Sequence, residues 1–363
     1  MKLRSLFLSA LCAVAVTAGF TSCSDDDDDW NPTQEGSKIN MVATRAFILN
    51  EGSYNGNNAG ITYFDWRQDT TYISDLYFAQ NGKNLGDTGQ DIVASGNNIY
   101  VVVYGSNYIA KLNSVGVEQA RLSFDSTVGK KVGQPRYAVE HNGYLYVTCY
   151  GGYVTKVNTT SMVAVDTVKV GLNPEYIAID NGYIYCTNSG WGSDNRVARI
   201  SINEFKKAEF FKVMDNPDHI LAVNNRIFVQ GYGAAYNYPW GELNTETGEF
   251  KEIGYCSSWA AHNGVIYLVN SVTDWNTHTT TNAFLTYDTR TNALATWNIK
   301  NIPAGLSSTS VSSMSINDKT GDIYIMTSDF VNNGSVYHVK ADGTYVGNFQ
   351  TTGITPRKIV FFD

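Results

Sequence analysis

The sequence predicts an all-β chain arranged as a seven-bladed β-propeller, and three observations carry that prediction. A short apolar motif of the Ile-Tyr-Val type recurs seven times, at intervals of 39 to 57 residues. A tight-turn sequence precedes most copies, and the C-terminal residues supply a half-repeat that the first copy lacks. Repeats of roughly 40–45 residues built from short strands are typical of propeller blades. The seven copies begin at Phe47, Ile99, Leu145, Ile184, Ile227, Ile266 and Ile323.

Composition agrees with this fold class. The 363 residues include 24 Tyr, 16 Phe, 7 Trp and 32 Gly, and only 17% are charged. Aromatic residues favour strands and glycines favour tight turns, and no long stretch shows a helical period. The repeats leave no room for a domain of another type, so we expect one propeller over residues 44–363.

Each repeat has the same internal order. In the stretch from Pro174 to Tyr185, an apolar segment opened by Pro leads to Asn181-Gly182 and then to the Ile-Tyr-type strand. Asn-Gly pairs suit two-residue hairpin turns because both positions tolerate positive φ. We therefore expect four-stranded antiparallel blades: an inner strand, a tight turn, the Ile-Tyr-Val strand, a longer loop, then a third and a fourth strand.

The chain ends predict how the ring closes. Residues 355–363 match the Pro-plus-inner-strand half of a repeat, and the first repeat, starting near Thr44, lacks that half. Pairing of the C-terminal strand with the first repeat removes the exposed edges of a linear stack. The long interval between Ile266 and Ile323 could hold an eighth blade, but no Asn-Gly turn followed by an Ile-Tyr-type strand lies within it. Seven blades is therefore the prediction.

The N-terminus has the features of a lipoprotein signal. Lys2 and Arg4 precede an apolar run and then small residues, which indicates a secretory signal peptide over residues 1–22. Cys23 stands where a bacterial lipobox places the lipidated cysteine, although Phe20 departs from the usual aliphatic residue. We expect lipidation at Cys23; a plain signal peptide with an incidental cysteine is the alternative.

Five consecutive aspartates follow the cysteine. The run Asp25 to Asp29 cannot pack, so we expect residues 23–43 to be a lipidated cysteine followed by an acidic, disordered linker. Without Lys2 and Arg4 the chain has 24 basic and 34 acidic residues, and this balance argues against nucleic acid as a partner.

Three cysteines remain in the predicted propeller, namely Cys149, Cys186 and Cys256. Two of them lie in or at the end of strands of different repeats, and the number is odd. We expect small buried thiols. One disulfide with one thiol left over is the alternative.

The loops that follow the Ile-Tyr-Val strands are rich in aromatic, Asn, Ser and Gly residues. Because neighbouring strands alternate in direction, these loops share a face with the Pro-containing loops and lie opposite the Asn-Gly turns. Their composition is typical of recognition surfaces and predicts a wide, aromatic-floored bowl for a large, flat, polar-edged ligand. The alternative is that these aromatics are buried packing residues beneath the loops, or that Tyr-Gly pairs simply end the strands. The candidate ligand-binding residues are Tyr54, Asn57, Tyr104, Tyr108, Tyr150, Tyr153, Trp191, Tyr232, Tyr236, Tyr238, Trp240, Trp275 and Phe330.

The Pro-containing loops are expected to surround the mouth nearer the axis. Among their residues, Arg136, Trp259 and Arg357 are further candidate ligand contacts. Ion pairs between neighbouring blades are an equally open alternative for the charged positions. The other residues in this set are Gln90, Gln134, Glu175, Asp218 and His219.

Catalytic motifs are sparse, and we expect no enzyme, no metal site and no catalytic cofactor. The sequence lacks metal-type His spacings, a Gly-x-Ser-x-Gly turn, a phosphate loop and a calcium loop. His219 near Asp218 and Glu175 is a weak constellation for acid–base catalysis. A propeller lyase is the less favoured alternative.

The whole arrangement resembles the YncE-like propeller lipoproteins of gut Bacteroidetes. The matching features are Cys23-Ser followed by five Asp, the stretch Phe47 to Gly52, and repeats like Pro174 to Tyr185. Within this group the Leu-Asn-Glu-Gly opening is most similar to the BtuG-type lipoproteins. That resemblance implies a lipid-anchored protein on the outer cell surface that captures cobalamin (vitamin B12), a corrinoid, and delivers it to a BtuB-like TonB-dependent outer-membrane transporter. The alternative function is a surface propeller that binds glycan or protein through the same aromatics.

Overall fold

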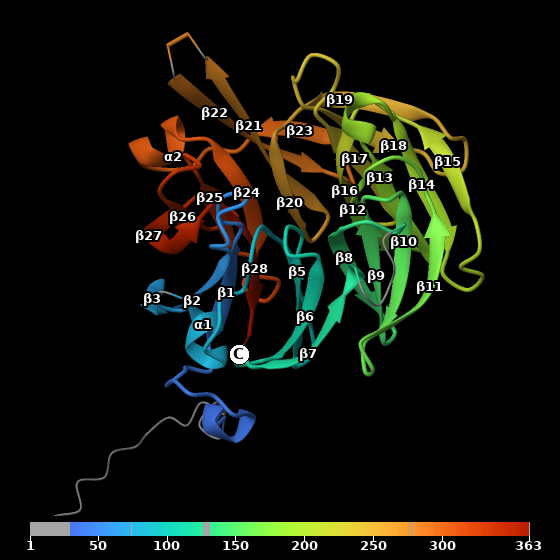
Figure 1. Ribbon diagram of the computed structural model, residues 1–363. Coiled ribbons are helices and arrows are strands. Elements are labelled where there is room, and N and C mark those ends of the chain that lie inside the picture. Colours follow the sequence, from blue (N-terminus) through green and yellow to red (C-terminus); the bar gives the residue numbers. More distant parts are fainter. Residues whose placement is uncertain (1–29, 74, 126–130, 275, 278, 363) are drawn as a thin grey trace, which may run out of the picture. The chain divides into compact units, whose positions relative to one another are not determined.

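Seven four-stranded antiparallel sheets follow one another along the chain and close into a ring (Figure 1). The computed structural model describes residues 30–73, 75–125, 131–274, 276–277 and 279–362. The predicted signal peptide and the lipidation site Cys23 lie outside the described residues. The all-β class, the four-stranded blades and the blade number are confirmed.

Blade 1 combines strands from both ends of the described chain: β28 (Pro356–Phe361), β1 (Arg45–Asn50), β2 (Gly60–Asp65) and β3 (Thr70–Ile73). Blade 2 contains β4 (Gly89–Ser95), β5 (Asn98–Val103), β6 (Tyr108–Asn113) and β7 (Glu118–Ser123). Blade 3 contains β8 (Pro135–His141), β9 (Tyr144–Cys149), β10 (Tyr153–Asn158) and β11 (Val163–Lys169). Blade 4 contains β12 (Pro174–Asp180), β13 (Tyr183–Asn188), β14 (Arg196–Ser201) and β15 (Ala208–Lys212).

The remaining blades follow in the same order. Blade 5 contains β16 (Pro217–Val223), β17 (Arg226–Gly231), β18 (Pro239–Leu243) and β19 (Phe250–Tyr255). Blade 6 contains β20 (Ser258–His262), β21 (Val265–Asp274), β22 (Thr279–Asp288) and β23 (Ala293–Thr296). Blade 7 contains β24 (Val311–Ile316), β25 (Ile323–Thr327), β26 (Asn333–Val339) and β27 (Tyr345–Ile354).

The ring closes in blade 1, as the chain ends predict. Strand β28, red in Figure 1, pairs antiparallel with blue β1, and Phe47 lies opposite Val360 in the register. The indole of Trp66 adds a hydrogen bond of 2.7 Å to the carbonyl oxygen of Phe362. The two ends of the sequence therefore form one sheet, in which β28 is the innermost strand.

The Asn-Gly turns have the expected conformation. Asn142 and Asn181 have φ of 51° and 47°, and the following Gly143 and Gly182 have φ of 80° and 79°. Two successive positive φ values match the hairpin turn that fits the twist of the flanking strands. The turn therefore fixes the register between the inner strand and the Ile-Tyr-Val strand of each of these blades.

The propeller unit begins earlier than the predicted boundary at residue 44. It starts at Asn31, and η1 (Pro32–Glu35) follows directly. Gln80 accepts a hydrogen bond from the Lys38 backbone at 2.8 Å and donates one to the Ser37 hydroxyl at 2.7 Å. The disordered-linker prediction is therefore wrong for residues 31–43, because their backbone groups are held by blades 1 and 2.

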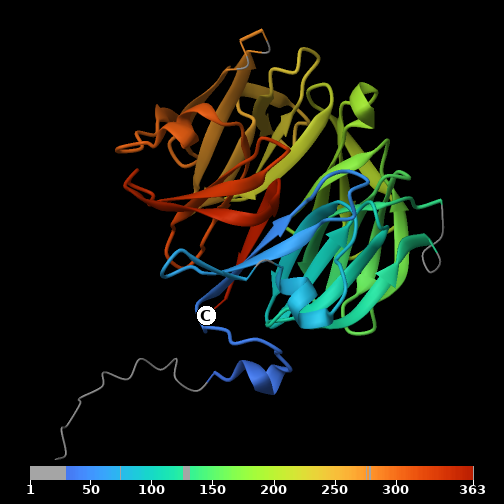
Figure 2. The same cartoon turned by 60° about the vertical axis from the view of Figure 1, so that its left-hand side comes forward.

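Short helices and one long hairpin sit among the blades. The helices are α1 (Leu76–Asn81), α2 (Ala304–Ser308) and η3 (Gly190–Gly192). Strands β21 and β22 pair over ten residues each and extend beyond their blade (Figure 2). In the described part of the chain, no helix is long and apolar enough to cross a membrane.

The cysteines belong to the core, as expected. Cys149, Cys186 and Cys256 are free and buried, each within an apolar cluster of packed strands. Burial raises the pKa of the Cys149 thiol to about 12, so this sulfur stays protonated at neutral pH. The disulfide alternative is wrong for these three residues.

A histidine joins blade 7 to blade 1. Nδ1 of His338, on β26, lies 2.7 Å from a carboxylate oxygen of Asp69, in the β2–β3 turn. Its Nε2 lies 3.1 Å from Asp322, and the ring stacks on Tyr324. Burial acts to lower the pKa of His338, but hydrogen bonding and the charges of Asp69 and Asp322 raise it above its usual value. Both ring nitrogens face carboxylates, so the protonated imidazole fits this position.

This geometry predicts a pH-dependent stability. A raised folded-state pKa stabilises the protein fully below about pH 6.5, and the stabilisation disappears as pH rises through the folded-state value. The free energy of unfolding should fall over that window by about 1.4 kcal/mol for each unit by which the pKa is raised. Urea titrations of the wild type and of His338→Gln measure it. Parallel pH profiles of the two proteins contradict the prediction.

Candidate functional site

The inner strands begin with a repeated irregularity that turns side chains toward the axis. In six of the seven inner strands the register shifts between the first residue and the third or fourth, as in a β-bulge. A bulge leaves residues without a partner and re-aims their side chains. The residues in these bulges are Gln90, Arg136, Tyr137, Glu175, Tyr176, Asp218, Ser312 and Arg357.

Threonines of the neighbouring blade hold two of these bulges. The Thr148 hydroxyl, on β9, donates to the Glu175 carbonyl oxygen at 2.6 Å. The Thr187 hydroxyl, on β13, donates to the Asp218 carbonyl oxygen at 2.5 Å. Both threonines are fully buried. The bulged backbone of one blade is therefore fixed by a hydrogen bond from the preceding blade, which makes the axial side chains rigid.

The first axial group is an ion pair between blades 3 and 4. Arg136 donates two hydrogen bonds to one carboxylate oxygen of Glu175, at 2.8 and 3.0 Å. The hydroxyl of Tyr150 donates to the other carboxylate oxygen at 2.6 Å. The guanidinium also lies over the rings of Tyr104 and Tyr150, 4.8 and 4.5 Å from their centroids. The ion-pair alternative raised by the sequence is correct for Arg136.

The second axial group is a stack of three rings from three successive blades. Tyr137 stacks on Tyr176 with centroids 3.6 Å apart, and Tyr176 stacks on His219 at 3.7 Å. The Tyr137 oxygen lies 2.8 Å from the Arg357 guanidinium and 2.6 Å from the Gln90 amide, both of which donate to it. Burial raises the pKa of Tyr137 to about 12 although Arg357 and Arg136 act to lower it, so the hydroxyl keeps its proton.

The remaining axial charges are paired as well. Nδ1 of His219 lies 2.6 Å from Asp218, and Arg357 lies 3.6 Å from Glu51. Burial acts to raise the pKa of Asp218, but His219 and Arg136 hold it below its usual value. The axial floor therefore contains several charged groups but presents little uncompensated charge.

A cavity of about 1090 Å³ opens above this floor. Its walls come from the loops of blades 5, 6 and 7, together with the projecting β21–β22 hairpin. Of the predicted site residues, the structure brings Arg136, Tyr232, Tyr236, Tyr238, Phe330 and Arg357 to this cavity. The rest of the wall is rich in uncharged polar side chains, among them Gln230, Asn237, Ser257, Asn270, Thr273, Thr280 and Ser310. We call this space the axial cavity.

The aromatic residues form two groups. Tyr232 packs against Tyr236 and Tyr238 at 6.2 and 5.6 Å between centroids, beside the axial cavity. Tyr150 packs edge-to-face between Tyr104, at 5.4 Å, and Trp191, at 6.4 Å. Four loop aromatics are largely exposed: Tyr54 at 73%, Trp191 at 73%, Tyr236 at 69% and Phe330 at 63%.

Several of these aromatics have a left-handed backbone. Trp191, Tyr236, Tyr238 and Phe330 have φ between 52° and 63°. Bulky residues are uncommon there, because Cβ crowds the carbonyl oxygen. Such conformations cluster at binding and active sites, where the surrounding structure holds them. In blade 7, the Ser328 hydroxyl accepts the Phe330 backbone hydrogen bond at 2.9 Å and so fixes that position.

Other predicted residues lie elsewhere. Trp240 and Trp259 pack in the core of blades 5 and 6, and Tyr108 is buried with its hydroxyl bonded to the Leu85 carbonyl. These three predictions are wrong, because the side chains point into the packed sheets rather than into the mouth. Tyr153 is half-buried against the blade 3 core.

Two further predicted residues sit on the β1–β2 loop, outside the axial cavity: Tyr54 and the exposed Asn57. Trp275 lies outside the described residues. The sequence reasoning missed Tyr137 and Tyr176, which it treated as strand residues. Both stand two positions after a Pro, one position beyond the charged residues that the sequence singled out. This common position relative to Pro is the sequence pattern that could have predicted both tyrosines as axial residues.

No family model and no curated protein matches the chain. Solved structures match it in fold. A proposed 6-phosphogluconolactonase of Bacteroides fragilis is 12% identical, with a TM-score of 0.61 over 90% of this chain and 100% of its own. A second, from Bacteroides uniformis, is 13% identical, with a TM-score of 0.61 over 88% and 99%.

Kuenenia stuttgartiensis hydrazine synthase is 14% identical, with a TM-score of 0.61 over 74% of this chain and 88% of its own. What these proteins share with the chain is the propeller fold. Identity this low carries no information on activity, which must be argued from the site itself.

Replacement by alanine should destabilise the protein strongly at the buried Trp240 and only slightly at the exposed Trp191. Trp240→Ala removes a fully buried ring and should lower the free energy of unfolding by about 3–5 kcal/mol. Trp191→Ala removes an exposed ring and should change it by less than about 1 kcal/mol. Urea denaturation of both variants measures the difference. Equal losses would show that Trp191 is a packing residue.

Proposed function

We propose that this chain is a surface-exposed, lipid-anchored binding protein that captures a corrinoid such as cobalamin in the axial cavity. The observation that carries the proposal is a large cavity with aromatic walls above an axial floor whose charges are paired. In this proposal the protein binds its ligand unchanged and does not act as an enzyme.

Cavity size supports a large ligand. Pockets for drug-sized molecules measure about 300–1,000 Å³, and the axial cavity, at about 1090 Å³, exceeds that range. Tyr232, Tyr236 and Phe330 offer apolar faces to a planar ring. Asn, Gln, Ser and Thr side chains around them offer donors and acceptors for peripheral carboxamides, which a corrinoid carries around its ring.

The paired arginines argue against a ligand that is anchored through a terminal phosphate. The single phosphate of cobalamin is an internal diester in its nucleotide arm, and this proposal does not place it on either arginine. Arg136 is bound to Glu175, and Arg357 to Tyr137 with Glu51 nearby. A phosphorylated substrate, as the names of the two Bacteroides structures suggest for those proteins, needs cations that are free to bind it. Recruiting either arginine would take the cationic partner away from Glu175 or Tyr137, and that loss opposes binding of a terminal phosphate here.

The localisation and the partner of this proposal rest on the sequence. Cys23 followed by five aspartates supports a lipid anchor on the outer cell surface, and the resemblance to BtuG-type proteins supports delivery to a TonB-dependent transporter. The anchor is the only membrane attachment in this proposal. Glycan binding is the second candidate, and the exposed Trp191 favours it, because an exposed indole is a platform on which a sugar ring can stack.

Isothermal titration with cyanocobalamin tests the proposal. The wild type should bind it, and Tyr236→Ala and Phe330→Ala should each weaken binding by roughly tenfold or more, because exposed aromatic anchors contribute about 2 kcal/mol. Phe210→Ala, on the outer strand of blade 4, removes an exposed aromatic far from the cavity and is the matched control. An absence of heat with cyanocobalamin, together with binding of an oligosaccharide, would favour the glycan function.

A further inference from the structure

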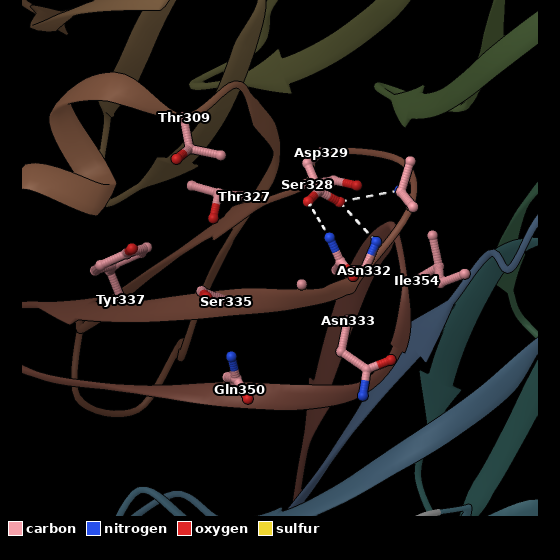
Figure 3. A pocket seen from close by; sticks show the side chains of 12 residues that line it. Thr309, Thr327, Ser328, Asp329, Asn332, Asn333, Ser335, Tyr337, Gln350 and Ile354 are labelled. Atoms are coloured by element: carbon pink, nitrogen blue, oxygen red, sulfur yellow. Dashed lines mark hydrogen bonds between the residues drawn. The ribbon is translucent and has the colours of Figure 1, made fainter.

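A second cavity lies in blade 7 (Figure 3), and it shares lining residues with the axial cavity. It has a volume of about 740 Å³ and lies among β25, β26, β27 and the segment that follows α2. Thr309, Ser328 and Asp329 line both cavities. We call the second space the side cavity. The two cavities are therefore neighbours with a common wall.

The loop of residues 328–332 forms the partition between them. Phe330 lines the axial cavity, whereas Val331 and Asn332 line the side cavity. Successive residues of the loop therefore face different cavities. Phe330 and Val331 are both largely exposed, at 63% and 72%. Apolar side chains this exposed at the lip of two cavities are available for contact with a ligand.

Hydrogen bonds hold the partition in place. Asp329 accepts from the backbone of Val331 at 2.9 Å and from the backbone and side chain of Asn332, both at 2.7 Å (Figure 3). Ser328 contacts Thr355, the residue just before β28, through their hydroxyls at 3.1 Å. These hydrogen bonds from Asn332 and Val331 lower the pKa of Asp329, so its carboxylate is charged at neutral pH.

The chemistry of the side cavity differs from that of the axial cavity. Its polar side chains are hydroxyls and carboxamides, and Asp329 is the single charged residue among those that line it in the described part of the chain. Tyr337 is the single aromatic there, and it is buried. The cavity therefore offers hydrogen bonds to an uncharged group and repulsion to an anionic one. The hydrogen-bonding residues are Thr309, Thr327, Ser328, Asn332, Asn333, Ser335 and Gln350.

We infer that the site takes a two-part ligand: a planar part in the axial cavity and an uncharged arm, ending in a carboxamide or hydroxyl, that crosses the loop of residues 328–332 into the side cavity. This inference rests on the proposed function and adds to it a determinant of specificity. The arm gains hydrogen bonds from Asn333, Ser335 and Gln350. An arm ending in a carboxylate is rejected, because it would lie beside the charged Asp329.

Filling the side cavity tests whether an arm enters it. Ser335→Leu places four carbons in the side cavity while leaving every residue of the axial cavity in place. It should weaken cyanocobalamin binding by roughly tenfold or more. Ser161→Leu, in the exposed β10–β11 turn, is the matched control and should bind as the wild type does. Thermal melts of both variants separate loss of the ligand from loss of the fold.

A charged probe tests the selectivity. The monocarboxylic acids of cyanocobalamin each carry one carboxylate in place of a peripheral carboxamide. At least one of them should bind the wild type roughly tenfold more weakly than cyanocobalamin, and Asp329→Asn should reduce that difference. Unchanged binding of cyanocobalamin to Asp329→Asn would show that the loop of residues 328–332 is intact in this variant.

The outcomes separate the two proposals. If the wild type does not bind cyanocobalamin, the corrinoid function fails and the two-part ligand fails with it. If the wild type binds cyanocobalamin and a folded Ser335→Leu binds it equally well, the side cavity is not used and only the further inference is overturned. Equal binding of cyanocobalamin and all of its acids overturns the role of Asp329.

Discussion

Closure of the ring through blade 1 is the constraint on which the rest of the structure depends. Pairing of β28 with β1 joins residues more than three hundred positions apart in the sequence and gives blade 1 its innermost strand. Once the ring is closed, the seven inner strands must start on one face and converge on one axis. The side chains at the beginning of the inner strands therefore point toward one another at the axis. The closure of the ring determines which of these residues come into contact. His338, on β26, adds a separate contact between blades 7 and 1 through Asp69.

The convergence of the inner strands also determines which charged groups meet in the axial floor. A buried charge is costly unless it is paired, so residues brought together at an axis must compensate one another. Arg136 with Glu175 meets this requirement across two blades, and His219 lies beside Asp218 within blade 5. The bulges at the strand starts make the pairing geometrically possible, because they release residues from the ladder. Under the proposed function, recognition therefore rests on the aromatic and amide groups above this floor.

The sequence predicted the repeating architecture well because strands, turns and blade period follow local rules. The Asn-Gly turns and the strand after Thr355 that completes blade 1 were predicted from such local patterns. The residues of the candidate site could be predicted from the sequence only in part. Alternation along a strand assigns faces, but a bulge shifts that alternation by a residue, and Tyr137 and Tyr176 therefore turn to the axis unpredicted. Trp191 and Trp240 both come after Ile-Tyr-Val strands in the aromatic loops, yet one is exposed and the other is buried. The side chain of Trp240, near the start of β18, packs against the neighbouring blade. Packing between blades has no local sequence signal.

Fold and recognition are separable in this molecule. Structures that share only 12–14% of the sequence share the propeller, so its strands tolerate nearly complete replacement of side chains. The loops cannot be equally tolerant if they bind a ligand. Trp191, Tyr236 and Phe330 hold bulky side chains in a backbone conformation that favours glycine, at a cost in stability. Folding alone gives no reason to place exposed aromatics there. The closed ring can carry that strain, and two of these residues, Tyr236 and Phe330, line the axial cavity.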